Sequence, residues 1–157
     1  MNTDNTSISC ETIDYGPCAF MDSYEANKVF SSIDQYGRYA FSNQSRVAPW
    51  NLSRLAETIL FLISENTSDA IKVVEEILFD FDKNFNNSLD ILSSRKLGFK
   101  NNSKKTSSLY FELLNLMEAG NADFTGTFKS LKATLIKEDD SIFFNNFRNS
   151  NEENVHA

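Results

Sequence analysis

The sequence has few cysteines, few prolines and no long apolar run. Cys10 and Cys18 are its two cysteines, and its one histidine lies at the far end of the chain, so a zinc centre is disfavoured and two reduced thiols are expected. The longest apolar run, residues 59–63, is far shorter than the roughly 20 residues of a membrane span. The first residues are polar and do not predict a secretory signal. We therefore expect a soluble protein of the cytoplasm.

Positive charge is also scarce. The 157 residues include 22 acidic and 15 basic side chains, which gives a formal net charge of −7. The basic residues are scattered along the chain, and this argues against a nucleic acid or an anionic membrane surface as the main partner. The length suffices for one domain with a core.

Apolar residues at helical spacing predict a mainly α-helical chain. Pro49 is expected as the first residue of a helix that reaches residue 64, with Trp50 as a core anchor. The sequence also predicts a helix or helix pair that is capped by residues 66–69 and extends towards Gly98. Further predicted helices are one over residues 106–119 that buries Leu109, Leu113, Leu116 and Met117, one capped by Asp123 with Leu135 on its apolar stripe, and a short aromatic helix over residues 142–147. We predict one domain over residues 1–148 and a disordered tail over residues 149–157.

The acidic residues of the second predicted helix raise the question of a metal site. A solvated helix face is the favoured interpretation, because such a face commonly carries charge. These residues are Glu75, Glu76, Asp80 and Asp82.

Turn-forming and polar residues dominate the amino-terminal stretch. Asp4 and Asn5 lie in a polar run, residues 8–13 can form a short extended segment, and residues 14–17 can close a turn. This layout predicts a short β-hairpin that brings Asn5 and Asp14 together. A carboxylate and an amide are oxygen ligands that suit a hard divalent cation. An ordinary polar hairpin with Asx turns is the alternative that the spacing leaves open.

Several blocks of the sequence occur in an order that closely resembles the selenoprotein O family. The resemblance is dense over about residues 1–60 and thinner to about residue 135. The blocks are residues 2–5, 12–17, 29–34, 37–39, 43–44, 50–52, 54–57, 95–98 and 122–125. The sequence departs from the family pattern at Cys10, where Gly is usual, and at Ala26 and Ser45, where Pro is common.

The resemblance implies a protein-kinase-like fold and a protein adenylyltransferase, which moves AMP from ATP to Ser, Thr or Tyr hydroxyls. It implies Asn5 and Asp14 as the residues that bind magnesium or manganese with ATP, and Asp4 as the catalytic acid/base. It also implies that Ser31, Ser32 and Arg38 help to shape a platform for protein substrates.

Family members are roughly three times as long, so the resemblance further implies a fragment of the C-terminal lobe. The phosphate-covering loop and the nucleotide-binding lysine are expected before Met1, and little turnover is expected from the chain alone. Whether the chain is itself an enzyme stays open. The alternative is a non-catalytic helical remnant or interaction module that binds no nucleotide. With 14 phenylalanines, the chain is also expected to expose apolar surface and to self-associate.

Overall fold

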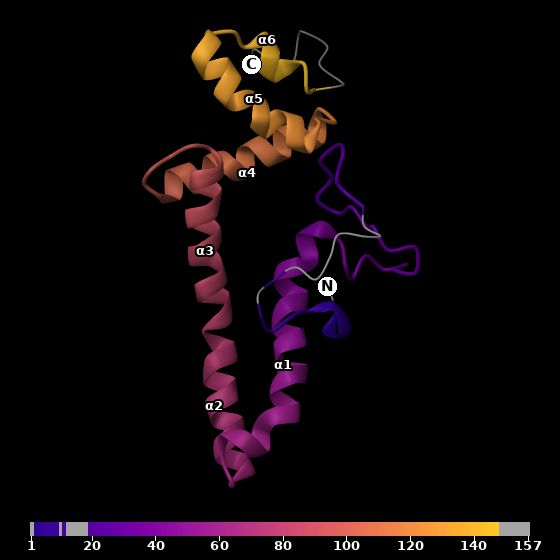
Figure 1. The fold of residues 1–157 in the computed structure, drawn as a ribbon, viewed down its shortest axis with the longest axis vertical. Coiled ribbons are helices and arrows are strands. Elements are labelled where there is room, and N and C mark those ends of the chain that lie inside the picture. Colours follow the sequence, from indigo (N-terminus) through magenta and orange to yellow (C-terminus); the bar gives the residue numbers. More distant parts are fainter. Residues whose placement is uncertain (1, 10, 12–18, 148–157) are drawn as a thin grey trace. The chain divides into compact units, whose positions relative to one another are not determined.

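The computed structural model describes residues 2–9, 11 and 19–147, and this part of the chain is mainly helical (Figure 1). Its elements are two 3-10 turns, η1 (Thr3–Asn5) and η2 (Phe41–Asn43), and the helices α1 (Gln44–Ile63), α2 (Thr67–Phe79), α3 (Phe81–Lys96), α4 (Lys104–Ala119), α5 (Phe124–Lys137) and α6 (Ser141–Phe144). Within these residues there is no strand, although Ser23 and Asp123 form an isolated antiparallel bridge. The predicted mainly helical class is confirmed.

The predicted amino-terminal β-hairpin is not seen. Ile8 and Ser9 lie in a turn, where the hydroxyl oxygens of Ser7 and Ser9 are 2.6 Å apart and the Ser9 N–H donates to the Ser7 hydroxyl at 3.3 Å. Serine hydroxyls compete for backbone groups in this way and favour turns over strands. The rest of the hairpin, residues 12–18, and the predicted tail, residues 149–157, lie outside the described residues. The kinase-like arrangement stays a prediction.

The prediction that α1 begins at Pro49 was wrong, because α1 begins at Gln44 and contains Pro49. Side chains at its start bind the preceding loop. The Gln44 amide donates to the carbonyl of Tyr39 at 3.1 Å, and the Asn43 amide donates to the carbonyl of Gly37 at 2.7 Å. These bonds stabilise an earlier first turn, even though a proline inside a helix removes one hydrogen bond and crowds the carbonyl four residues before it.

The chain folds into two compact units. The first comprises Met1–Ala19 and Val29–Asn87. In it, α1 and α2 pack against each other across a short connection (Figure 1). The predicted cap of α2 is confirmed, since the Asn66 side chain accepts a hydrogen bond from the Ser68 N–H at 2.9 Å.

The second unit comprises Phe20–Lys28 and Ser88–Ala157. Its core contains Tyr24, Leu114, Met117 and Ala122. The Tyr24 N–H donates to the carbonyl of Ala122 at 2.9 Å, so the segment before residue 29 is attached directly to the end of α4. The core therefore assembles around the carboxyl-terminal half of α4.

The predicted buried face of α4 is confirmed only in part: Met117 is buried and Leu113 packs against the core, but Leu109 and Leu116 are not buried. Leu109 and Leu116 are 48% and 63% exposed, whereas Leu114 and Met117 are buried. Leucines occur on several faces of this helix, so the choice among them follows from packing against Tyr24 and Ala122, which helical spacing alone does not reveal.

Two local signals were predicted correctly, the stop at Gly98 and the cap at Asp123. Gly98 follows α3 with φ +85°, and the N–H groups of Gly98 and Phe99 donate to the carbonyls of Arg95 and Ser94, which is the Schellman pattern. Asp123 caps α5 by accepting a hydrogen bond from the Gly126 N–H. In the part of the chain that the structure describes, no helix is both long and apolar enough to cross a membrane.

Candidate functional site

Asp4 and Asn5 lie together on the turn η1. The turn is closed by hydrogen bonds to Asn2: its carbonyl accepts from the Asn5 N–H at 3.2 Å, and its N–H donates to the Asn5 side-chain oxygen Oδ1 at 2.6 Å. The hydroxyl of Thr6 also donates to the Asn2 carbonyl, at 2.7 Å. Asn and Asp favour such turns because their short polar side chains bond to the nearby backbone. The turn η1 thus has a defined local geometry.

Both predicted site residues of this turn are open to solvent. Among the described residues, none donates a hydrogen bond to the carboxylate of Asp4. The Oδ1 atom of Asn5 has two lone pairs, of which the Asn2 N–H takes one. Within the part of the chain that the structure describes, one lone pair therefore stays available to a cation, so the chemistry of this oxygen fits the predicted metal ligand.

The second predicted metal ligand, Asp14, lies outside the described residues, as do Cys10 and Cys18. That Asp14 lies beside Asn5 stays a prediction. Within the described ranges, no three acidic, histidine or cysteine side chains gather into a metal site. The acidic residues Glu75, Glu76, Asp80 and Asp82 are exposed, as predicted for a solvated face.

A cavity of about 780 Å³ lies between the amino-terminal segment and α1, within the first unit. This volume falls within the range of small-molecule sites. Thr3 and Thr6, which flank Asp4 and Asn5 in the sequence, contribute to its wall. The full lining is Thr3, Thr6, Ser7 and Ile8 from the segment and Ala48, Trp50, Asn51, Leu52, Arg54, Leu55 and Thr58 from α1. The predicted catalytic turn therefore adjoins a space large enough for a ligand.

Asn51 of α1 is a buried polar residue in the wall of this cavity, with 5% of its surface exposed. Its side-chain nitrogen Nδ2 donates to the hydroxyl of Thr6 at 3.5 Å. Its Oδ1 atom is buried and has no hydrogen-bond partner within the described part of the chain. Sequence reasoning treated this position only as part of a family block. The missed signal was an amide four residues after Val47, on the same buried helix face.

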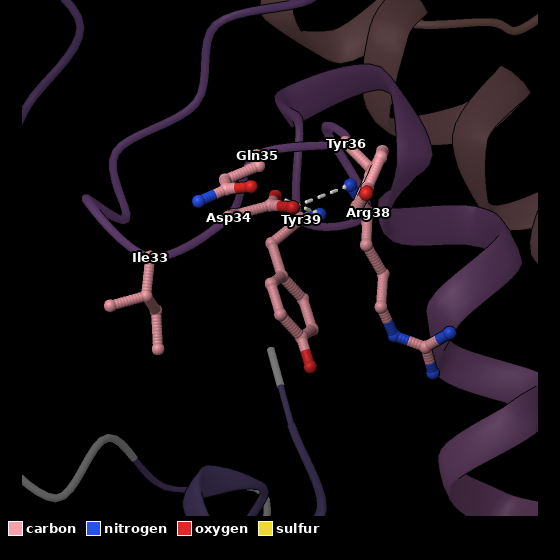
Figure 2. Close-up of a pocket in the computed structure, with 6 residues that line it drawn as sticks. All are labelled: Ile33, Asp34, Gln35, Tyr36, Arg38 and Tyr39. Carbon is pink, nitrogen blue, oxygen red and sulfur yellow. Dashed lines mark hydrogen bonds between the residues drawn. The ribbon is translucent and has the colours of Figure 1, made fainter.

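A second cavity, of about 450 Å³, lies in the loop before α1, and Figure 2 shows the six residues that line it. Asp34 organises this loop, because its carboxylate accepts hydrogen bonds from the N–H groups of Tyr39 at 2.8 Å and Arg38 at 3.0 Å. The Tyr39 N–H, followed by that of Arg38, lowers the pKa of Asp34 below its ordinary value. In Figure 2 the side chains of Arg38 and Tyr39 extend from the loop in a common direction.

Trp50 is not the buried anchor that was predicted, since 42% of its surface is exposed. Instead its ring lies beside two guanidinium groups: the Cζ atom of Arg38 is 4.4 Å from the ring centre and that of Arg54 is 5.6 Å. Arg54 also forms an ion pair with Glu57 at 2.5 Å. The faces of an indole ring attract cations, which explains why this tryptophan packs at a charged surface.

Comparison with known proteins gives one consistent family. The family model described as "Protein adenylyltransferase SelO" matches residues 1–156. Proteins named "Protein nucleotidyltransferase YdiU" are similar to the chain: that of Brevibacillus brevis is 47% identical over 92% of this chain, and that of Pelagibacter ubique is 50% identical over 87%. The matches cover 29% and 28% of those relatives, so the chain spans less than a third of their length.

Proposed function

The chain belongs to the SelO family of protein adenylyltransferases, and from this premise we propose that it carries part of the active site for AMP transfer from ATP to protein hydroxyls. The observation that carries the proposal is the turn η1. It presents Asp4 and Asn5 side by side, and the residues on either side of them line the cavity of about 780 Å³. Because the chain spans less than a third of its relatives, the activity of the complete protein is part of the proposal.

In the proposed reaction, the oxygen of a Ser, Thr or Tyr hydroxyl forms a bond to the α-phosphorus of ATP. The bond from that phosphorus to the bridging oxygen breaks, and pyrophosphate leaves. Asp4 acts as the general base that accepts the hydroxyl proton. An exposed carboxylate that accepts no hydrogen bond from the described residues is able to take this role when substrate approaches.

Asn5 and Asp14 would hold magnesium or manganese, which neutralises phosphate charge when it is bound. One amide oxygen and one carboxylate leave most coordination positions to water and phosphate, and magnesium sites of this composition are common. The free lone pair of Asn5 Oδ1 supports this assignment. The family resemblance supports Asp14.

A non-catalytic helical module is the second candidate, favoured by a different observation. Large apolar side chains are exposed on α1 and α2, including Phe61 and Phe79 at 74% and 86%. Exposed apolar surface of this kind marks interaction sites. Such a module would need neither Asp4 nor Asn5.

Thermal unfolding with and without millimolar magnesium and ATP distinguishes these candidates. We expect the nucleotide to raise the midpoint temperature of the unmodified chain, because a ligand that binds only the folded state stabilises it. Asp14→Ala should abolish this increase. Glu75→Gln, which removes one exposed negative charge on α2, should keep it. A midpoint that does not respond to nucleotide would contradict the enzymatic proposal.

A further inference from the structure

We propose that Asn51 is a positioning residue that holds the turn η1, with Asp4 and Asn5, against α1. What the turn does chemically rests on the proposed function. The attachment itself rests on the contacts of Asn51, Thr6 and Asn2.

Asn51 occupies a position that helical spacing would give to an apolar residue. It lies four residues after Val47, and each has 5% of its surface exposed. An amide buried at such a position costs free energy unless its polar atoms are bonded. One of them is bonded, since Nδ2 donates to the Thr6 hydroxyl, 45 residues away in the sequence.

From Thr6 the hydrogen bonds continue to Asn5 with consistent donors and acceptors. The Thr6 hydroxyl accepts from Asn51 and donates its own hydrogen to the Asn2 carbonyl at 2.7 Å. The Asn2 N–H in turn donates to Asn5 Oδ1 at 2.6 Å. Three hydrogen bonds thus connect a buried helix position to the oxygen that is the proposed metal ligand.

The other polar atom of the Asn51 amide makes this arrangement testable. Oδ1 of Asn51 is buried and unpaired within the described residues. A buried acceptor without a donor costs stability, so an apolar side chain of similar size would suit the fold of α1 better. Asn51→Leu should therefore weaken the attachment of the turn η1 to α1, while the stability of α1 stays the same or increases.

The test is millisecond hydrogen exchange of the Asn5 amide in the 157-residue chain, together with its thermal midpoint. Asn51→Leu should raise the Asn5 exchange rate about fivefold, the size expected for loss of one hydrogen bond. The thermal midpoint should stay unchanged or rise. Thr6→Val should raise the rate similarly, the double variant no further, and Thr6→Ser should keep the original rate.

Thr58→Val is the matched control. Thr58 lines the same cavity from the same helix, but its hydroxyl donates to the carbonyl of Leu55 within α1. This variant should leave the Asn5 exchange rate unchanged. An unchanged rate in Asn51→Leu, or rates that multiply in the double variant, would overturn the positioning role.

Binding of Mn²⁺ and ATP to the same proteins separates this inference from the proposed function. If exchange at Asn5 responds as expected but the unmodified chain binds no nucleotide, the attachment stands and the enzymatic proposal fails. If nucleotide binds and Asn51→Leu changes neither exchange nor the Mn²⁺ affinity, the positioning role fails and the enzymatic proposal stands.

Discussion

The guanidinium of Arg38 lies over the ring of Trp50, with its Cζ atom 4.4 Å from the ring centre. This contact joins the loop of the second cavity to α1. Trp50 is the single tryptophan of the chain, so its fluorescence reports on the contact directly.

Replacing Arg38 by alanine should weaken the first unit. We expect the free energy of unfolding to fall by about 0.5–1 kcal/mol, the usual strength of a cation–π contact at an exposed site. The tryptophan emission should move to longer wavelength as water replaces the guanidinium. Urea denaturation followed by this emission measures both changes. The control is Arg46→Ala, which removes an exposed arginine from α1, the helix that carries Trp50, and should change neither the stability nor the emission. Equal effects of the two variants would refute the role of the contact.

Acid should release the loop that Asp34 organises. Its folded-state pKa is lowered chiefly by the Tyr39 N–H, so the carboxylate stabilises the loop above its ordinary pKa, and this contribution disappears as the pH falls through the lowered value. Amide chemical shifts of Arg38 and Tyr39 should titrate together, with a midpoint below the ordinary value of 3.8. In Asp34→Asn this titration should vanish. A midpoint at or above 3.8 would contradict the assignment.

Features encoded by neighbouring residues were predictable from the sequence. The caps at Asn66 and Asp123 and the stop at Gly98 depend on hydrogen bonds within about five residues, so the local pattern revealed them. The common location of Asp4 and Asn5 on one turn is equally local.

Features that depend on distant contacts were not predictable in this way. Trp50, predicted as a core anchor, lies instead beside the guanidinium of Arg38 from the preceding loop. The start of α1 was missed for another reason: its bond to Tyr39 is local, but Pro49 gave a competing start signal. Asn51 gains its role from Thr6, 45 residues away. A single sequence shows such a residue only as a polar interruption of an apolar pattern.

The cap of α5 gives a stability prediction in the second unit. Asp123→Ala should lower the free energy of unfolding by about 1 kcal/mol, because the Gly126 N–H loses its acceptor. Far-UV circular dichroism during urea denaturation measures this loss. Asp140→Ala is the control, because Asp140 precedes α6 without a side-chain capping bond. If both variants lost the same stability, the loss would not come from the cap.

Exposed apolar side chains on α1 and α2 predict self-association. Phe61 and Phe79 leave most of their rings in water, and burial between copies would remove this surface from solvent. Sedimentation velocity should show an average mass that rises with concentration, and the double variant Phe61→Gln, Phe79→Gln should reduce that rise. Ile33→Gln, which replaces a similarly exposed residue in the loop before α1, should have little effect on the average mass. A single monomeric species at all concentrations would contradict this prediction.

Substitution of Asp4 should lower the rate of AMP transfer, whereas substitution of Asp14 should weaken the binding of metal and nucleotide. In a chimera in which this chain replaces the matching segment of the Brevibacillus brevis relative, Asp4→Asn should lower AMP transfer about 10²–10⁴-fold, the usual contribution of a general base. Its affinity for Mn²⁺ and ATP should stay unchanged, because the proposed metal ligands Asn5 and Asp14 remain. Asp14→Asn should instead weaken binding of the metal and nucleotide. Transfer of labelled AMP and Mn²⁺ binding separate the two effects, and normal transfer by Asp4→Asn would exclude Asp4 as the base.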